Sequence, residues 1–179
     1  MKKIISLLLV AIVAVAMLAG CSGGAKPTDP ADVKGETFDG GNVSALVPEG
    51  WMAFHGTDYF NDYEEGYDPS VINIVKDAKS ELDMFTNPYV MINYYGPDSY
   101  FMSSRDLYDD AKDIEPMEIG SYSWSGYAHE GYGYPTAVLE ATDGTISIQV
   151  TVILENGNKK ISLDDAEVQA IIASITPAQ

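Results

Sequence analysis

The sequence predicts an α+β fold in which an antiparallel β-sheet meander is flanked by helices. Residues 145–154 alternate apolar and polar side chains, which is the pattern of a strand with one buried face. Shorter apolar runs before this segment are separated by Gly, Pro and Asp, as the strands of an antiparallel sheet are. Residues 162–177 instead place apolar side chains at helical spacing. Helices that cover an antiparallel sheet form a layered domain.

The N-terminal segment, residues 1–20, has the organisation of a secretory signal peptide. Lys2 and Lys3 precede the apolar run IISLLLVAIVAVAML, and small residues follow up to Cys21. The run is shorter than the about 20 apolar residues that a membrane-spanning helix needs, so a retained helical anchor is the less favoured alternative. We therefore expect this segment to direct the protein out of the cytoplasm.

The motif LAGC at the end of this segment resembles the lipobox of bacterial lipoproteins; it is formed by Leu18, Ala19, Gly20 and Cys21. In that family the chain is cut before the cysteine, which carries a diacylglyceryl group. Two acyl chains anchor a protein stably, whereas one does not. The resemblance implies that Cys21 is lipidated and holds the protein on the cell membrane, facing the extracytoplasmic side. The chain has no second cysteine with which Cys21 could form a disulfide.

Residues 21–34, CSGGAKPTDPADVK, have the composition of a flexible tether, because small, polar and Pro residues prevail and apolar periodicity is missing. The remaining residues, 35–179, suffice for one domain with a single core. The sequence therefore divides into a signal peptide, a tether and one α+β domain.

The first half of this domain contains three candidate strands and one candidate helix. NVSALVPEGW (42–51) predicts a short strand ended by Pro48, and SVINIV (70–75) and YVMINYY (89–95) predict two more. In residues 103–116, Ser103 is suited to cap a helix that Pro116 would end. The apolar line of this helix would consist of Leu107, Tyr108, Ala111 and Ile114.

The second half predicts a three-stranded meander and a final helix. The strands are residues 121–130, 135–141 and 145–154, with Asp143-Gly144 as a two-residue hairpin turn. Ser162 is suited to cap the helix, whose first turn carries acidic residues. The side chains expected on buried faces are Ile146, Ile148, Val150, Val152 and Leu154 in the last strand and Val168, Ile171, Ile172 and Ile175 in the helix.

An early strand running into VPEGW, the meander and the final segment DDAEVQAIIASI together resemble bacterial members of the PsbP-like family, whose fold is an α/β/α sandwich. The resemblance covers Phe38 to Thr176, with SYFMSSRDLYDDA as a departure from the family's pattern. It implies a small, non-enzymatic binding or assembly factor. Because no metal-ligand motif of the family can be placed on this chain, no functional residue is carried over.

The chain is strongly acidic, with a formal net charge of −17. Loss of Lys2 and Lys3 with the signal peptide leaves 10 − 2 = 8 basic residues against 27 acidic ones, which gives 8 − 27 = −19. Such a charge opposes binding to nucleic acid and to anionic lipid heads. Cations, basic proteins and neutral ligands remain open as partners, and a high charge also simply keeps a domain soluble.

The sequence carries none of the common catalytic signatures. His129-Glu130 begins like a zinc-protease motif, but no second histidine follows four residues later. GSYSWSG lacks the glycine spacing of a nucleophile elbow. We therefore predict a protein that is not an enzyme and uses no cofactor. A triad of dispersed residues around His55 or His129 is the alternative.

Five acidic residues within positions 58–68 could supply oxygen ligands for Ca²⁺. Phe60 and Tyr63 interrupt the order of acids that an EF-hand loop requires. A solvated acidic loop without a metal ion is therefore the favoured interpretation. The five residues are Asp58, Asp62, Glu64, Glu65 and Asp68.

Aromatic residues supply the candidate binding site. Tyr59, Tyr63 and Tyr67 recur every four residues, and Trp124 belongs to a second aromatic group in residues 122–134. Tyrosine offers an apolar face and a hydroxyl, which suits sugars, peptides and the centre of a protein interface. We predict that Tyr59, Tyr63 and Tyr67 bind a ligand or partner, with Trp124 as a fourth candidate. Packing in the core is the alternative for the three tyrosines, and for Trp124 it is the favoured of the two interpretations.

These observations predict a membrane-anchored extracytoplasmic lipoprotein. Its domain would be a non-catalytic binding or accessory module for a protein or cell-envelope partner. The alternative is a small-ligand binding protein, for a saccharide or a divalent cation, that uses the loop between His55 and Ser70.

Overall fold

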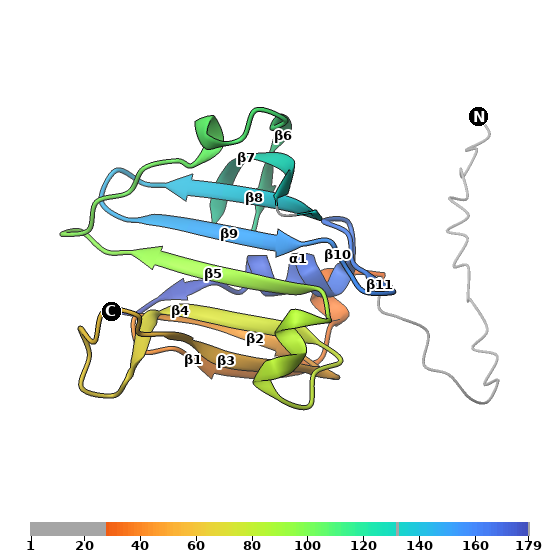
Figure 1. Cartoon of the computed structure of the whole chain (residues 1–179), viewed down its shortest axis with the longest axis horizontal. Helices are drawn as coiled ribbons and strands as arrows, with labels where there is room; N and C mark the ends of the chain where they lie inside the picture. Colours follow the sequence, from red (N-terminus) through yellow and green to blue (C-terminus); the bar gives the residue numbers. More distant parts are fainter. Residues whose placement is uncertain (1–27, 132, 179) are drawn as a thin grey trace, which may run out of the picture.

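A computed structural model describes residues 28–131 and 133–178 of the chain (Figure 1). The predicted signal peptide, the lipobox and Cys21 lie outside the described residues. Within the predicted tether, Pro30–Asp32 form a short 3₁₀ helix, η1, which the side chain of Asp29 caps by accepting a hydrogen bond of 2.9 Å from the backbone N–H of Ala31. The end of the tether is therefore folded onto the domain, where η1 contacts the C-terminal helix α1 (Ala166–Ala173).

Strands dominate the described part of the chain. The strands are β1 (Gly35–Asp39), β2 (Val43–Pro48), β3 (Trp51–Thr57), β4 (Tyr67–Lys76), β5 (Tyr89–Tyr95), β6 (Lys112–Ile119), β7 (Tyr122–Gly131), β8 (Tyr134–Thr142), β9 (Ser147–Ile153), β10 (Glu155–Asn156), β11 (Lys159–Lys160) and β12 (Thr176–Pro177). The helices that remain are the 3₁₀ helices η2 (Glu81–Phe85) and η3 (Arg105–Leu107). The predicted strands 70–75, 89–95, 121–130, 135–141 and 145–154 are confirmed as β4, β5, β7, β8 and β9.

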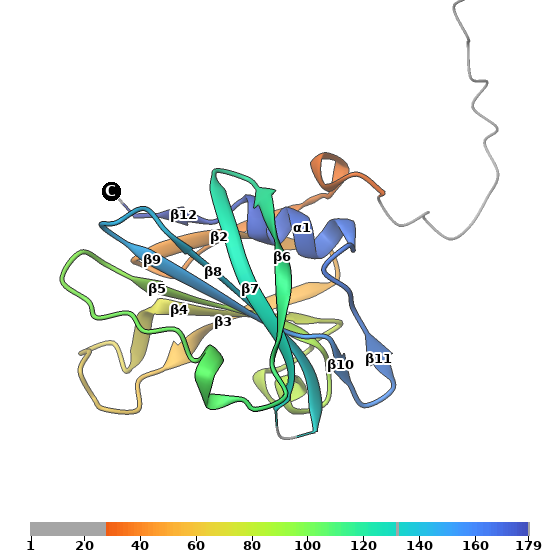
Figure 2. The ribbon, with the colours of Figure 1, turned by 90° about the horizontal axis from the view of Figure 1, so that it is seen from above.

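Two antiparallel sheets form the body of the domain. The larger sheet has the strand order β3-β4-β5-β9-β8-β7-β6, and the smaller one has the order β1-β2-β12. In Figure 2, α1 and the small sheet lie on one side of the large sheet, and the β5–β6 connection lies on the other. The domain is therefore built mainly of antiparallel sheet, with one α-helix among the described residues.

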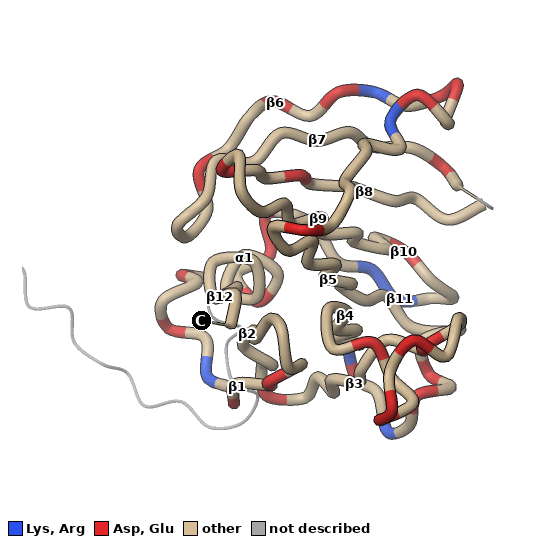
Figure 3. Tube along the Cα trace, turned by 90° about the vertical axis from the view of Figure 1, so that its left-hand side faces the viewer, with Lys and Arg blue, Asp and Glu red and all other residues tan. Residues whose placement is uncertain are grey.

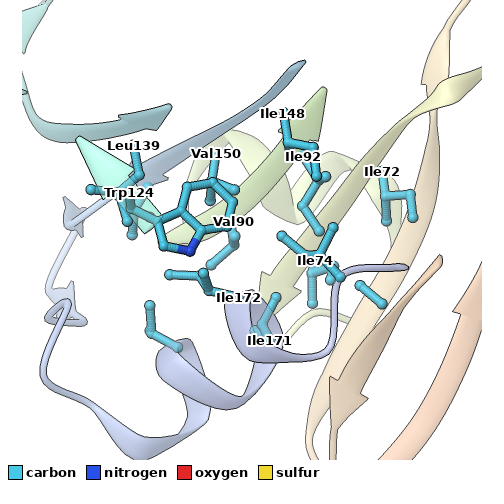
Figure 4. Packing of buried hydrophobic residues seen from close by; sticks show 14 of the residues in the cluster. Ile72, Ile74, Val90, Ile92, Trp124, Leu139, Ile148, Val150, Ile171 and Ile172 are labelled. Carbon is cyan, nitrogen blue, oxygen red and sulfur yellow. The ribbon is translucent and has the colours of Figure 1, made fainter. Parts of the chain in front are cut away.

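The hydrophobic core lies between the large sheet and the layer formed by α1 and β2. Figure 4 shows side chains of β4, β5, β8 and β9 packed toward Ile171 and Ile172 of α1. The predicted inward face of the last strand is confirmed at Ile148, Val150 and Val152, which are buried. The predicted helix face is also confirmed, since Val168, Ile171, Ile172 and Ile175 are all buried.

The predicted helix over residues 103–116 is wrong. Only η3 forms there, and residues from Lys112 onward pair with β7 as the edge strand β6. The physical reason is that Ile114 and Met117 pack against the core from this strand, while Leu107 of the expected helix face is 76% exposed. Pro116 lies at a register shift of the edge strand, a position that a proline tolerates.

The predicted two-residue hairpin turn is also wrong. Four residues, 143–146, connect β8 to β9, since Thr142 pairs with Ser147. Gly144 has a φ of 87°, a value that favours glycine. One carboxylate oxygen of Asp143 accepts hydrogen bonds from the backbone N–H groups of Thr145 and Ile146, at 2.8 and 2.9 Å. These bonds stabilise a longer loop than the Asp-Gly pair alone implies.

The C-terminal helix is shorter than predicted, and its cap is Asp165 rather than Ser162. Asp165 accepts a hydrogen bond of 3.1 Å from the backbone N–H of Ser162, so Ser162 belongs to the turn before the helix. Thr176 and Pro177 leave the helix and pair with β2. The expected α/β/α sandwich has a helical layer on each face of its sheet. Among the described residues α1 covers one face of the large sheet, and no second helical layer covers the other.

A search of the described residues finds no helix that is both long and apolar enough to span a membrane.

Candidate functional site

A cleft of about 560 Å³ lies between the two sheets, where β1 and β3 are their outermost strands. Residues 34–38 and 47–53 line it. They come from β1, from the end of β2, from the tight turn at Glu49 and Gly50, and from the start of β3. Ligand sites of proteins are mostly concave and of about 300–1,000 Å³, so this cleft has the size of a binding site.

Aromatic side chains lie in the cleft lining and in a stack beside it. Phe38 and Trp51 belong to its lining. The ring of His55 lies 4.8 Å from that of Phe38 and stacks on that of Tyr67 at 3.8 Å. The ammonium group of Lys76 lies 4.7 Å from the centre of the Trp51 ring. Rings held in this way lose little conformational entropy when they contact a partner.

The β3–β4 loop, residues 58–66, continues from this aromatic stack and is held by Asp58. Its carboxylate accepts hydrogen bonds from the backbone N–H groups of Tyr63 at 2.9 Å, Asp62 at 3.1 Å and Phe60 at 3.2 Å. The bond from Tyr63 contributes most to lowering the pKa of the Asp58 carboxyl below its ordinary value of 3.8, and the other backbone bonds add to this effect. Partial desolvation raises the pKa and so opposes them. The loop therefore has a defined shape that rests on Asp58.

Two large side chains of this loop point into solvent. Tyr59 is 81% exposed and Phe60 is 84% exposed. Tyr63 is less exposed, and its pKa is raised by burial first and then by the nearby charges of Asp68 and Asp62. Exposed aromatic rings are enriched in surfaces that bind proteins.

Three of the four predicted binding residues lie on or next to one surface loop. Tyr59, Tyr63 and Tyr67 belong to the β3–β4 loop and the strand that follows it. Trp124 does not join them, because it is 1% exposed and its indole N–H donates a hydrogen bond of 3.0 Å to the backbone oxygen of Ile119. The favoured interpretation of Trp124 as a core residue is therefore correct.

Sequence reasoning missed Phe38 and Trp51 as neighbours of this site, whereas His55 and Phe60 belong to the segment between His55 and Ser70 that the alternative interpretation named. The run WMAF, residues 51–54, was the available signal, since an uncharged apolar run with no clear alternation begins directly after the turn Glu49-Gly50. Its position at a sheet edge depends on strand order and does not follow from the run itself.

The five acidic residues of the loop region do not gather around one point. Among the described residues, no three His, Cys, Asp or Glu side chains lie close enough to hold a metal ion. Asp58 is instead occupied by the backbone of its own loop, and Asp68 accepts a hydrogen bond of 2.8 Å from the backbone N–H of Ser70.

A second, polar cavity of about 420 Å³ lies beside β6 and β7. Its charged and polar groups contact one another: Arg105 forms an ion pair of 2.7 Å with Asp113, and Gln149 donates a hydrogen bond of 3.1 Å to Glu140. The hydroxyl groups of Tyr127 and Ser104 lie 2.7 Å apart. Tyr127 is buried, so this cavity offers no open aromatic face of the kind that saccharides stack on.

His129 is buried on the face of the large sheet opposite α1, under the β5–β6 connection. Its ring stacks on that of Tyr108 at 3.7 Å. Burial lowers the pKa of His129 below its ordinary value of 6.5, and the nearby negative charge of Asp110 opposes this shift. The neutral imidazole is therefore the form that the folded state prefers.

We predict a pH dependence of stability from this buried imidazole. As the pH falls below the ordinary pKa of 6.5, His129 binds a proton in the unfolded chain, whereas in the folded chain it stays neutral to a lower pH. The free energy of unfolding therefore falls as the pH drops from about 7 to about 5. The carboxyl groups of Asp58 and Asp110, whose pKa values are lowered, affect the pH dependence of stability only at about pH 3.8 and below, outside this window.

Urea unfolding of the wild type and of His129→Gln across this pH range measures the effect. The variant should lose less stability than the wild type on acidification, because its side chain does not titrate. Parallel pH profiles would show that the burial of His129 has no such consequence.

Comparisons with known proteins yielded distant likenesses. No family model matches the chain, and none of the curated proteins does. A crystal structure from Bacteroides thetaiotaomicron VPI-5482 aligns with a TM-score of 0.47 and 14% identity over 81% of this chain, which spans about half (49%) of that protein. The solution structure of cyanobacterial PsbP (CyanoP) from Synechocystis sp. PCC 6803 aligns with a TM-score of 0.42 and 11% identity, over 89% of this chain and 99% of the other. Both scores are below 0.5, so the chain is similar to these proteins in outline only, and its membership of the PsbP-like family stays a prediction.

Proposed function

We propose that this chain is an extracytoplasmic lipoprotein whose domain binds a basic segment of a partner protein and has no catalytic activity of its own. The observation that carries the proposal is an open cleft along β1 and the start of β3, together with exposed aromatic rings on the loop that follows β3. Tyr59 and Phe60 stand in solvent beside acidic residues, and the loop that presents them is fixed by Asp58. Rigid aromatic anchors are the residues that contribute most to protein interfaces.

The charge of this region supports a basic partner. Residues 34–68, which comprise the cleft and the loop, contain eight Asp and Glu residues and one Lys. Figure 3 shows acidic residues gathered on the loop next to β3 and β4. Complementary charge increases the association rate and excludes acidic competitors. Lipidation at Cys21 would keep the domain near partners at the same membrane.

Crosslinking in living bacterial cells tests this function. The full chain carries a photo-crosslinking residue in place of Tyr59, and a matched chain carries it in place of the exposed Glu115 of β6. We expect a discrete crosslinked protein from the Tyr59 position alone. The same product should disappear when Asp62, Glu64 and Glu65 are replaced by Lys.

The replacement of Tyr59 and Phe60 by Ala should weaken binding of that protein by about tenfold or more, as the loss of interface anchors does. Both side chains are exposed, so the fold is unaffected. No product from Tyr59, or the same product from both positions, would contradict the proposed function.

A further inference from the structure

We propose that the cleft between β1 and β3 binds its partner segment as an added β-strand, along the free edge of β3. The proposal rests on the proposed function and specifies how the partner is held. Strand addition uses the backbone hydrogen-bonding groups of an exposed sheet edge for affinity and side-chain pockets for specificity. Three properties of the cleft point to this mode of binding.

The first property is that β3 is an unprotected edge. From Trp51 to His55 it carries no charged residue and no proline. The opposite edge of the same sheet, β6, has Pro116, a register shift between Ile114 and Met117, and several charged side chains. Proteins protect exposed edges with such features, because a bare edge recruits other strands. The register shift of β3 lies between His55 and Gly56, beyond the residues that line the cleft, so the edge from Trp51 to Ala53 is without these features.

The second property is the direction of the backbone groups. Asp77 donates its N–H to the oxygen of Gly50 at 2.9 Å, which fixes the phase of the β3–β4 ladder. Because hydrogen-bonded and free positions alternate in an antiparallel pair, the N–H and C=O groups of Trp51 and Ala53 point away from β4. Both residues line the cleft.

The facing edge of β1 has the same arrangement. Glu49 donates its N–H to Lys34 and Gly40 donates its N–H to Val43, each at 2.9 Å. The alternation therefore directs the backbone groups of Gly35 and Thr37 away from β2. Both residues also line the cleft, so its two sides present backbone donors and acceptors to whatever enters.

The third property is charge, which identifies the occupant as a basic segment. The cleft lining holds Glu36, Glu49 and Lys34, and the other six acidic residues of residues 34–68 lie outside it, mostly on the β3–β4 loop. With a formal net charge of −17, a second copy of this chain would be repelled. The acidic residues would attract a strand that carries Lys or Arg. Phe38, which is half-buried in the lining, would contact an apolar side chain that alternates with those basic residues.

The test uses two synthetic probes with the purified full chain. The Lys-Val probe is a fluorescein-labelled peptide of about ten alternating Lys and Val residues, an extended segment of the kind described for strand addition. The Glu-Val probe replaces every Lys by Glu. Fluorescence anisotropy should show saturable binding of the Lys-Val probe and none of the Glu-Val probe.

A version of the Lys-Val probe with every second backbone nitrogen methylated distinguishes strand pairing from simple charge attraction. It keeps its charges and side chains but lacks the N–H donors of one edge. Two probes methylated on alternate registers cover both edges of the peptide. We expect at least one of them to bind about tenfold more weakly or worse.

Variants of the protein test the same contact from the other side. Thr37→Pro and Ala53→Pro each remove an outward N–H, at sheet edges where proline is tolerated. Thr37→Val and Ala53→Ser are the matched controls, since they keep the N–H. We expect about tenfold weaker binding for the proline variants only, with circular dichroism confirming that all four proteins are folded.

The outcomes separate this inference from the proposed function. Equal binding of all methylated and unmethylated Lys-Val probes overturns strand addition, and so does a failure of the Lys-Val probe to bind. In either case a partner crosslinked specifically at Tyr59 still supports the proposed function. Absence of that crosslink overturns the proposed function itself.

Discussion

Replacing Trp124 by Ala is expected to lower the free energy of unfolding by about 3–5 kcal/mol. Trp124 is the largest of the fully buried side chains and belongs to the core cluster between the large sheet and α1. The substitution leaves a cavity and deprives the backbone oxygen of Ile119 of its hydrogen bond from the indole N–H. Because a domain is stable by only about 5–15 kcal/mol, this is a large part of the total.

Urea unfolding followed by tyrosine fluorescence and circular dichroism measures the change. Tyr59→Ala is the matched control, because its side chain is exposed and its loss should change stability by less than about 0.5 kcal/mol. A loss of less than about 1 kcal/mol for Trp124→Ala would mean that Trp124 is not part of a close-packed core.

Replacing Cys21 by Ala is expected to abolish lipid attachment. The thiol of Cys21 is the sole thiol of the chain, so no other cysteine can take the acyl group. Bacterial cells fed with labelled palmitate should incorporate the label into the wild type and not into Cys21→Ala. The variant should also move from the membrane fraction to the soluble fraction, since the two acyl chains provide the anchoring energy.

The control is Ser22→Ala, which leaves the LAGC motif intact and should label like the wild type. Equal labelling of the wild type and Cys21→Ala would contradict the lipoprotein interpretation. The binding function of the domain would then have to be considered without a membrane anchor.

Local sequence patterns predicted those elements whose burial follows one simple period. The alternation in residues 145–154 gave β9 and its buried face at Ile148, Val150 and Val152, and the helical spacing of Val168, Ile171 and Ile172 gave the buried face of α1. In both segments the burial depends on one neighbouring layer, so the periodicity is visible in the sequence itself.

The helix expected in residues 103–116 shows where such reasoning fails. Its four apolar residues match helical spacing, but Ile114 packs into the core only because β6 pairs with β7. That pairing places Met117 opposite Trp124, a contact that no local pattern encodes. Tertiary packing here overrides local preference.

The candidate site was predictable in part. The exposure expected for the group of Tyr59, Tyr63 and Tyr67 is confirmed at Tyr59 and Tyr63, because a polar, acidic loop does not bury its aromatic residues. Their role in binding stays a prediction. The cleft was not predictable, since β1 and β3 belong to different sheets and line it together only in the folded domain. Trp124 had been kept as a binding candidate beside its favoured interpretation as a core residue, and its burial agrees with the core interpretation.

Hydrogen exchange of the full chain, with and without the Lys-Val probe, tests most directly whether the cleft is the binding site. The backbone N–H groups of Trp51 and Ala53 point away from β4, so they should exchange rapidly in the free protein. The account predicts that the probe slows exchange at these two residues and at Gly35 and Thr37 across the cleft. Unchanged exchange at all four residues, with protection elsewhere in the described domain, would contradict it.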